Sequence, residues 1–349
     1  MHIKIEKPVI ESIINQAISF TEKKDNTQIT SHFLIKADDK LTLKATDKEM
    51  GIEIQTQAEI LEPGIITLNA RKFTEIIKTL QNKEIEIKSE QDKVTIIQEN
   101  SIYQLASFNP AEFPEFPDEK KEELKIDGEE FIKAIKKIFP AIDNNNPKQE
   151  LNGALFDIKE KTNFVGTDSR RLALYSADAK GKESEIIVPK RAVSEIKRVF
   201  RNDMKILYDE VYLILKNENI LFFTKLMNGK FPAYERIIPK EFKFIIKLDK
   251  KEFLNHLRQV SIISNEVKIT ITKDKIEFES MSKENMQAKT SYEINSDIDE
   301  FSFAINSKYL IDFLNVIDKD EFELCLNSPS TTIMVKEDKF ITLIMPLSL

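Results

Sequence analysis

An internal repeat with a period of about 120 residues constrains the fold of this chain more than any other feature. Three segments share one pattern, in which a short strand end leads through a polar turn into an amphipathic helix. They are KIEKPVIESII from Lys4, KIDGEEFIKAI from Lys125 and KLDKKEFLNHL from Lys247. A second helical pattern follows in each unit, at 69–80, 189–200 and 306–317. Six helices that keep one spacing are not expected by chance, so the sequence predicts a triplicated unit.

Alternating apolar and polar residues between these helices predict strands, for example at 40–46, 51–57, 84–90, 93–99, 211–217, 220–226 and 275–280. Two dipeptides support the register of the repeat, because Thr46-Asp47 recurs as Thr167-Asp168 and Phe113-Pro114 recurs as Phe231-Pro232. The predicted fold class is α+β with three repeated domains at 1–120, 121–242 and 243–349. The segments 108–123 and 232–243 contain several prolines and charges and are expected to be extended linkers.

The sequence contains few residue patterns that would indicate a catalytic or metal-binding site. The three histidines, His2, His32 and His256, form no metal-binding spacing, and the single Cys325 excludes an internal disulfide. The seven glycines are scattered, so no phosphate-cradling loop is expected. No signal peptide and no apolar run of roughly 18 residues is present. We therefore expect no catalytic residue, no cofactor, no metal and no membrane association, and a cytoplasmic location.

The net charge of −7 argues, taken alone, against a protein that coats nucleic acid. The six helical windows together nevertheless carry +10, which leaves −17 for the rest of the chain. These windows are residues 7–24, 71–78, 129–137, 190–201, 250–258 and 308–317. If the helices share one side, that side attracts phosphates without reading sequence. Aromatic stacking platforms are not evident on the helices, so duplex is the expected ligand.

A series of motifs in a specific order resembles the bacterial DNA polymerase III β subunit, the sliding-clamp family, over essentially the whole chain. The motifs are ATDKEMG (45–51), ARKFTEI (70–76), AEFPEFPD (111–118), LNGALF (151–156), GTDSRRLAL (166–174), IVPKRAV (187–193), GKFPAYERIIP (229–239), IISNE (262–266), YLIDFLNVI (309–317) and MPLSL (345–349). The resemblance implies three clamp domains, each with two inner helices and outer antiparallel sheets. It also implies that two chains pair head to tail into a six-domain ring around duplex DNA. Such a ring does no chemistry and acts as a processivity factor that tethers the replicative polymerase during DNA replication.

The resemblance further implies three sets of functional residues. Sequence-independent DNA contact is expected from Lys23, Lys24, Arg71, Lys72, Lys133, Lys136, Lys148, Gln149, Lys190, Arg191, Lys197, Arg198, Lys250 and Lys251. A pocket for a partner peptide between the second and third domains is expected from Leu151, Thr167, Arg170, Arg171, Leu172, Pro232, Arg236, Ile237, Leu343, Met345, Pro346 and Leu347. The dimer contact is expected to join Tyr103 and Leu105 to Ile262 and Ile263.

The implied partners are a second copy of the chain, double-stranded DNA, the replicative polymerase, the clamp-loader complex and other proteins with a clamp-binding peptide. The implied location is the cytoplasm, in association with the nucleoid. Ser169 and Arg170 stand where the family usually has Gly and His, and Ser348 replaces a common Arg. Two other classes remain open at this point: a DNA-binding module that grips one face of the duplex, and an enzyme.

Overall fold

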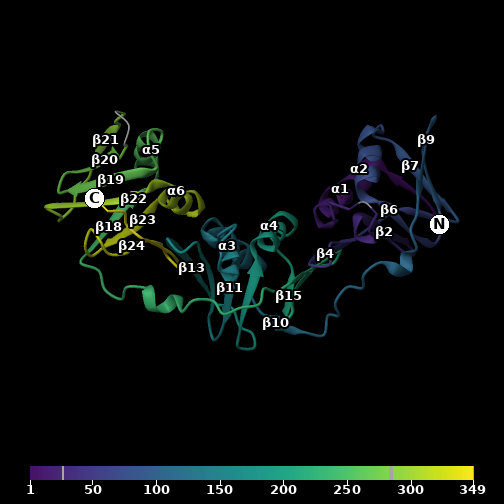
Figure 1. Ribbon diagram of the computed structural model, residues 1–349, viewed down its shortest axis with the longest axis horizontal. Helices are drawn as coiled ribbons and strands as arrows, with labels where there is room; N and C mark the ends of the chain where they lie inside the picture. Colours follow the sequence, from purple (N-terminus) through teal and green to yellow (C-terminus); the bar gives the residue numbers. More distant parts are fainter. Residues whose placement is uncertain (26, 283–285, 349) are drawn as a thin grey trace. The chain divides into compact units, whose positions relative to one another are not determined.

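The computed structural model describes residues 1–25, 27–282 and 286–348 (Figure 1). All six predicted helices are present among these residues. They are α1 Lys7–Ala17, α2 Ala70–Thr79, α3 Gly128–Ile138, α4 Lys190–Val199, α5 Lys250–Ser261 and α6 Ser307–Val316. The first helix is shorter than expected, because α1 gives way to a 3-10 turn at Ile18–Phe20 and Lys23 and Lys24 lie in the loop beyond. The last residue of the MPLSL motif, Leu349, lies outside the described residues.

The strands follow one order in the three repeats, with β5 as an addition in the first, and the seven segments predicted as strands are confirmed. The first repeat has β1 His2–Glu6, β2 His32–Ala37, β3 Leu41–Thr46, β4 Met50–Thr56, β5 Glu59–Glu62, β6 Gly64–Asn69, β7 Glu84–Glu90, β8 Lys93–Gln98 and β9 Ser101–Ala106. The second has β10 Glu122–Leu124, β11 Gly153–Ile158, β12 Thr162–Thr167, β13 Arg171–Ala177, β14 Ser184–Pro189, β15 Lys205–Tyr208, β16 Tyr212–Lys216 and β17 Ile220–Lys225. The third has β18 Phe244–Asp249, β19 Glu266–Thr272, β20 Lys275–Ser280, β21 Lys289–Glu293, β22 Glu300–Asn306, β23 Glu321–Leu326, β24 Ile333–Glu337 and β25 Phe340–Ile344.

Each repeat contains two antiparallel meanders. The first meander, β2-β3-β4 in the first repeat, is extended by β6 beside β2. The second, β7-β8-β9, is extended by β1 beside β7. Strands of different repeats also pair, because β17 joins β4 and β25 joins β13. We call the β4–β17 ladder the first joint and the β13–β25 ladder the second joint.

The described chain forms two compact units. One comprises Met1–Lys125 with Asp203–Leu226, and the other comprises Ile126–Asn202 with Met227–Leu349. Each joint therefore lies inside one unit: the first joint in the former and the second joint in the latter. Because β17 pairs with β4, strands β15, β16 and β17 of the second repeat belong to the same compact unit as the first repeat.

The helices cover the sheets with apolar faces that the repeat predicts. Ile10, Phe131 and Phe253 occupy the same position of the first helix in the three repeats, and all are fully buried. Phe131 packs edge-on against Phe164, and Phe253 packs edge-on against Phe278. Burial of such a side chain contributes about 2–3 kcal/mol, so this position helps to anchor each helix on its sheet. Figure 1 shows α1 and α2, which contact each other, side by side in the first repeat.

The two linkers are less extended than expected, and aromatic residues fix them to the sheets. Each contains a 3-10 turn, at Pro110–Glu112 and at Tyr234–Ile237. Phe113 in the first linker and Phe231, which directly precedes the second, are the repeated Phe of the two segments, and both are buried. The linkers are therefore parts of the packed structure and not free spacers.

Candidate functional site

The second joint brings together two segments of the predicted peptide pocket. Arg171 lies opposite Ile344 and Leu172 lies opposite Leu343 in the β13–β25 ladder. The ladder continues past β25, because the Met345 amide donates to the Arg170 carbonyl at 2.9 Å. The Leu347 amide donates to the Ala304 carbonyl of β22 at 2.7 Å. The segment after β25 is thus held along its length by backbone hydrogen bonds.

An apolar cluster lies beneath this segment. Leu151, Leu172 and Leu343 are buried in one cluster with Phe231, Tyr234 and other residues of β11 to β14, β23 and β24. Half-buried side chains that the sequence prediction missed pack against it, namely Met227, Ile238, Phe242 and Ile341. Met345 and Ile237 are the exposed apolar members of the predicted set, at 56% and 54% exposure, and Pro232 and Arg236 are also exposed. Arg170 is also exposed, whereas Pro346 and Leu347 are half-buried. The predicted pocket residues therefore divide into a buried group, a half-buried pair and an exposed group that we call the rim.

Thr167 builds a turn that the first repeat also has. Its hydroxyl donates to the Arg171 carbonyl at 2.6 Å and accepts from the Ser169 amide at 3.2 Å. Thr46 makes the same two bonds, to the Met50 carbonyl at 2.9 Å and from the Lys48 amide at 3.0 Å. The repeated Thr-Asp dipeptide is therefore explained by a shared turn, in which the hydroxyl of Thr167 is already used.

Arg171 is a buried ion-pair centre. Its Nε donates to Asp168 at 3.0 Å, one terminal nitrogen donates to Asp312 of α6 at 2.6 Å, and the other donates to the Pro140 carbonyl. The guanidinium also lies over the Tyr309 ring, 4.5 Å from its centroid. Because its donor groups already have partners and it is only 7% exposed, Arg171 shapes the joint and presents no open charge.

A buried hydrogen bond positions the second linker. The Tyr234 hydroxyl donates to Asp157 Oδ2 at 2.6 Å and accepts from the Asn163 amide at 3.0 Å. Burial, followed by the bond to Asp157, raises the pKa of the Tyr234 hydroxyl, so it stays protonated and donates at neutral pH. This contact holds the start of the exposed 236–237 rim on strands β11 and β12. The GKFPAYERIIP motif contains Tyr234 and was the sequence signal that could have identified it.

The predicted DNA-contact residues occupy several environments. Over the six helices as bounded by the structure the net charge is +8, because Glu22, Lys23, Lys24 and Arg201 fall outside them. Exposed members of the predicted set are Lys23, Lys24, Arg71, Lys72, Lys133, Lys136, Lys148, Gln149, Arg191, Arg198 and Lys251. Half-buried members are Lys190, Lys197 and Lys250. The basic character of the helices is thus present, and it is distributed unevenly.

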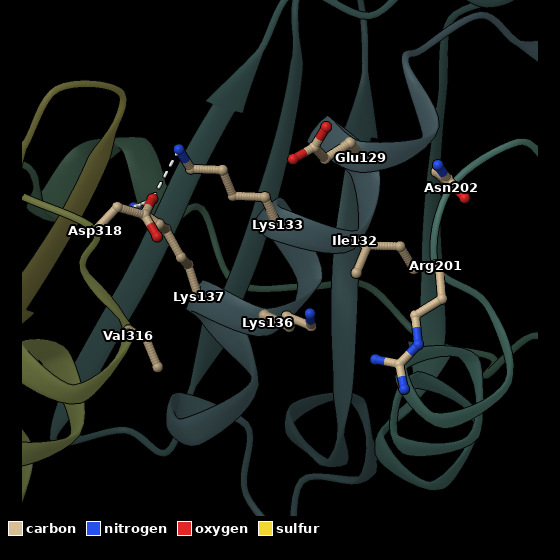
Figure 2. A pocket seen from close by; sticks show the side chains of 9 residues that line it. All are labelled: Glu129, Ile132, Lys133, Lys136, Lys137, Arg201, Asn202, Val316 and Asp318. Carbon is tan, nitrogen blue, oxygen red and sulfur yellow. Dashed lines mark ion pairs between the residues drawn. The ribbon is translucent and has the colours of Figure 1, made fainter.

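A cavity of about 550 Å³ beside α3 gathers several cations (Figure 2). Lys133 and Lys137 turn to Asp318, at 2.7 and 3.1 Å, and Lys137 also pairs with the buried Glu337. Figure 2 shows the ends of Lys136 and Arg201 lying away from Asp318, toward which Lys133 points. Arg201 was counted in the helical window 190–201 but was not among the predicted DNA-contact residues, and the structure places it just after the end of α4 at Val199.

Three lysines of the predicted set are held by the protein itself. Lys190 Nζ donates to the Ile142 carbonyl at 2.5 Å, and Lys250 Nζ donates to the Ile317 carbonyl at 2.8 Å. Lys197 Nζ lies 3.4 Å from the centroid of the Phe139 ring. Burial, with the nearby charges of Lys136 and Lys190, lowers the pKa of Lys197 to about 8. Lys197 is therefore partly neutral at mildly alkaline pH.

Two strands break the threefold pattern of pairing. In the second and third repeats the last strand of the second meander finds a partner, β17 on β4 and β25 on β13. The counterparts β9 and β21 each have one neighbour, β8 and β20, among the residues that the structure describes. The predicted Tyr103 and Leu105 lie on β9, whereas Ile262 and Ile263 follow α5 and lie on no strand. Sequence reasoning missed β21, whose free edge appears only once the sheets are assembled.

Comparisons with known proteins agree with this geometry. Models of the DNA polymerase III beta subunit match its N-terminal domain at residues 1–117, its central domain at 125–233 and its C-terminal domain at 235–348. A beta sliding clamp of Helicobacter pylori is 34% identical over 375 residues, with full coverage of both chains. One of Haemophilus influenzae is 25% identical over 352 residues and covers 96% of each. The crystal structure of the Helicobacter pylori beta clamp bound to DNA ligase peptide has a TM-score of 0.96 at 33% identity, with full coverage of both chains.

The chain thus has the fold of a sliding clamp, with three repeated clamp domains built of helices and antiparallel sheets. It belongs to the DNA polymerase III beta subunit family. Members of this family are non-catalytic processivity clamps of DNA replication that form dimeric rings around DNA, and the chain is such a clamp. None of the helices in the described part of the chain is long and apolar enough to cross a bilayer.

Proposed function

We propose that this clamp divides DNA contact, partner binding and subunit closure among three separate surfaces. The observation that carries the proposal is the repeat itself, which supplies basic helices in each copy. It also leaves exposed apolar residues beside the second joint, and it leaves β9 and β21 with one strand neighbour each among the described residues. The proposed domains span 1–120, 121–242 and 243–349, and the proposed site of action is the cytoplasm, on the nucleoid. The topological test is retention on nicked circular DNA and release once that circle is linearised. Equal retention on both would show a module that grips one face of the duplex.

DNA contact is assigned to exposed cations on the helices and at their ends, with Lys136 of α3 and Arg201 just after α4 as the pair in one cavity. Loss of each phosphate contact reduces the salt dependence of DNA affinity by about one unit of slope, whatever the sequence. The variant Lys136→Ala with Arg201→Ala is therefore expected to bind duplex more weakly at low salt and to show a shallower slope. Lys93→Ala, on strand β8, is the control and should leave the slope unchanged. An unchanged slope in the double variant would remove these residues from the DNA surface.

Partner binding is assigned to the exposed rim over the apolar cluster of the second joint. The Helicobacter pylori clamp structure contains a DNA ligase peptide, which supports a short peptide as the ligand class. For this chain the proposed owners of such peptides are the replicative polymerase, the clamp loader and other clamp-binding proteins. Apolar walls provide affinity in such a groove, and a few polar groups set the register.

The test of the groove removes the two exposed apolar residues of the rim. Met345→Ala with Ile237→Ala should lower the affinity for a polymerase C-terminal peptide at least tenfold, because both side chains are open to a ligand. Leu172 is avoided because truncation of a buried Leu costs about 2–5 kcal/mol in stability as well. Leu61→Ala, an exposed apolar residue on β5, serves as the control. Unchanged peptide affinity with an intact fold would place the groove elsewhere.

A further inference from the structure

The third repeat leaves open a sheet edge that the first repeat fills with a strand of its own. In the first repeat β5 pairs with β1, whereas β18 is the end strand of its eight-stranded sheet. Its one strand neighbour among the described residues is β23. We propose that the free edge of β18 binds an extended segment of a partner protein, with acidic and apolar residues in the order that β5 shows. This contact is additional to the three surfaces proposed above and does not depend on them.

Strands β1 and β18 hold the same place in their repeats, because each leads directly into the first helix. The Lys7 amide of α1 donates to the Lys83 carbonyl, just before β7, at 3.1 Å. The Lys250 amide of α5 donates to the Asp320 carbonyl, just before β23, at 2.8 Å. Counting back from these two amides aligns the strands. The equivalent pairs are His2 and Ile245, Ile3 and Ile246, and Lys4 and Lys247.

The backbone groups on the free side of β18 meet no strand in the described part of the chain. In an antiparallel ladder alternate residues turn their amide and carbonyl to the same side. Because Lys250 bonds on the β23 side, the groups of Ile245 and Lys247 face the free side. On β1 the equivalent groups face β5, where Lys4 lies opposite Glu59. The edge of β18 thus presents the same donors and acceptors that β1 uses to hold β5.

Side-chain exposure differs as a missing strand predicts. The Lys4 side chain is 35% exposed beside β5, whereas the Lys247 side chain is 67% exposed on β18. Ile245 is 61% exposed. A lysine on an edge strand discourages pairing with another chain, but an exposed isoleucine in a strand of six residues favours it. Ile245 therefore distinguishes this edge from one that is only protected.

The charge at the free edge favours an acidic segment. Lys4 and Lys247 pair with equivalent carboxylates of their ladders, Glu84 at 3.4 Å and Glu321 at 2.5 Å. On β1 a second carboxylate acts on the lysine, because the hydrogen bond to Glu84 and the charges of Glu84 and Glu59 raise the pKa of Lys4. No strand in the described residues supplies a counterpart of Glu59 to β18. An acidic residue of the bound segment would take that place.

The chain's own counterpart of β5 is held elsewhere. Strand β5 lies between β4 and β6, and the corresponding connection of the third repeat is 294–299, between β21 and β22. The Ile294 amide donates to the Asp274 carbonyl at 2.9 Å. The Ser296 amide donates to the Lys273 carbonyl, also at 2.9 Å. This connection is tied to the turn between β19 and β20, so it does not supply the missing strand.

The other sheet edge of the third repeat is already occupied, and the first repeat shows that both edges can be occupied together. The Leu347 amide donates to the Ala304 carbonyl of β22, and the Phe108 amide donates to the Thr67 hydroxyl of β6 at 2.8 Å. In the first repeat this contact coexists with β5 on β1. A strand on β18 therefore does not have to displace the segment after β25.

The register of β5 gives the order of residues in the bound segment. Glu59 lies opposite Lys4, and two apolar residues, Ile60 and Leu61, follow it. An antiparallel segment on β18 would accordingly place an acidic residue opposite Lys247 and an apolar residue opposite the residue before it. Main-chain hydrogen bonds provide affinity in such strand addition, and the side chains provide specificity. The ligand class is thus an extended segment in which an acidic residue precedes two apolar residues.

The test uses a labelled peptide with the sequence of residues 57–64, QAEILEPG, added to the full chain. Fluorescence anisotropy should give a Kd of about 1 mM or lower. Ile245→Pro removes the outward amide and should weaken peptide binding about tenfold or more, because proline cannot donate to the new ladder. The bonds of β18 to β23 are spared, since the Ile245 amide faces away from β23.

A charge exchange tests the register without a change of backbone. Lys247→Glu should weaken binding of the peptide about tenfold, since an opposite-charge pair becomes a like-charge pair. A peptide with lysine in place of Glu59 should bind this variant better than it binds the unsubstituted protein. Lys36→Glu is the control, because Lys36 is an exposed strand lysine that also pairs with a carboxylate, and it should alter neither affinity.

The outcomes distinguish this edge from other sites. The absence of peptide binding in the millimolar range would overturn the proposal, and so would equal binding by the control and by Lys247→Glu. Loss of binding in Met345→Ala with Ile237→Ala, but not in the β18 variants, would place the peptide in the groove of the second joint. Self-association beyond a dimer that Ile245→Pro abolishes, without peptide binding, would make a second copy the occupant. Urea unfolding checks the fold of Ile245→Pro, and the charge exchange decides if that variant is unfolded.

Discussion

The two joints inside the chain share one register and differ in what fills them. At the first joint Gly51 lies opposite Phe223, and a Cβ added at Gly51 would come within 2.5 Å of the Phe223 ring. The Phe116 ring of the first linker packs edge-on against Phe223 at 4.8 Å. At the second joint the same pair is Leu172 and Leu343, with Met345 exposed beside it.

This difference explains why only the second joint is proposed as a groove. At the first joint the Phe223 ring occupies the space that a side chain at position 51 would take, and the Phe116 ring packs edge-on against it. At the second joint Leu172 and Leu343 are both buried, and Met345 is exposed. The fold therefore creates two joints with one register, and the side chains at the opposed pair differ between them.

The largest expected effect concerns Arg171, whose counterpart at the first joint is the buried Met50. Arg171→Met leaves Asp168 and Asp312 without their buried partner, so we expect a loss of about 3–5 kcal/mol in the free energy of unfolding. Urea unfolding of the variant and of the unsubstituted protein measures this loss in the free energy of unfolding. A loss below about 1 kcal/mol would mean that solvent reaches this ion pair.

A smaller effect is expected when Gly51 of the first joint is replaced by leucine, the residue at the equivalent position 172 of the second joint. Gly51→Leu drives a side chain into the Phe223 ring and should cost about 1–3 kcal/mol or more. Adding Phe223→Leu recreates the Leu–Leu pair and should recover part of that loss. A double-mutant cycle measured by urea unfolding tests the coupling. If the effects of the two substitutions on the free energy of unfolding were strictly additive, the side chains at positions 51 and 223 would not compete for one space.

The turns that precede β4 and β13 should respond alike. Lys48 and Ser169 both have φ of 73°, a left-handed conformation that disfavours residues with a Cβ. Lys48→Gly and Ser169→Gly are each expected to raise stability by about 0.5 kcal/mol, since relief of strain exceeds the entropy that glycine adds to the unfolded chain. Thr95→Gly, within strand β8, is the control and should lower stability by about 1 kcal/mol. A loss at either turn would show that its side chain has a role of its own.

The smallest expected effect depends on pH. Lys197 has a pKa of about 8 in the folded protein, below the ordinary value of 10.5, so the unfolded chain binds more protons between these two values. Its contribution to stability should therefore rise as pH increases from about 8 to 10.5. Over the same range the charge that Lys197 offers to DNA is lost, and duplex affinity should fall.

The comparison that tests this pH effect uses the equivalent lysine of the first repeat, Lys78, which is exposed. Lys197→Arg should remove part of the change in DNA affinity between pH 7 and pH 9, whereas Lys78→Arg should leave it intact. Salt-matched binding titrations at the two pH values provide the measurement. Equal pH profiles for the two variants would contradict the depressed pKa of Lys197.

Much of the fold follows from local patterns in the sequence. The six helices and seven strands were predicted because periods of 3.6 and 2 residues depend on near neighbours. The Thr-Asp dipeptide was predicted only as a marker of the repeat, and the structure shows that it forms a shared turn. The prediction of the first helix failed at its end, where the charges of Lys23 and Lys24 were counted in a helix that stops at Ala17. Helix ends depend on weak terminal contacts, which a periodic pattern does not reveal.

The sequence by itself determined the triplication, the family and the basic character of the helices. Only the tertiary structure decided that Arg171 pairs with Asp312 and that Tyr234 anchors the second linker. It also decided that β9 and β21 each have one strand neighbour within the described part of the chain. The physical reason is distance along the chain: these features depend on pairings between strands and side chains far apart in sequence. A repeat predicts that such pairings recur, but which side chains face each other at a joint is decided only when the two strands meet.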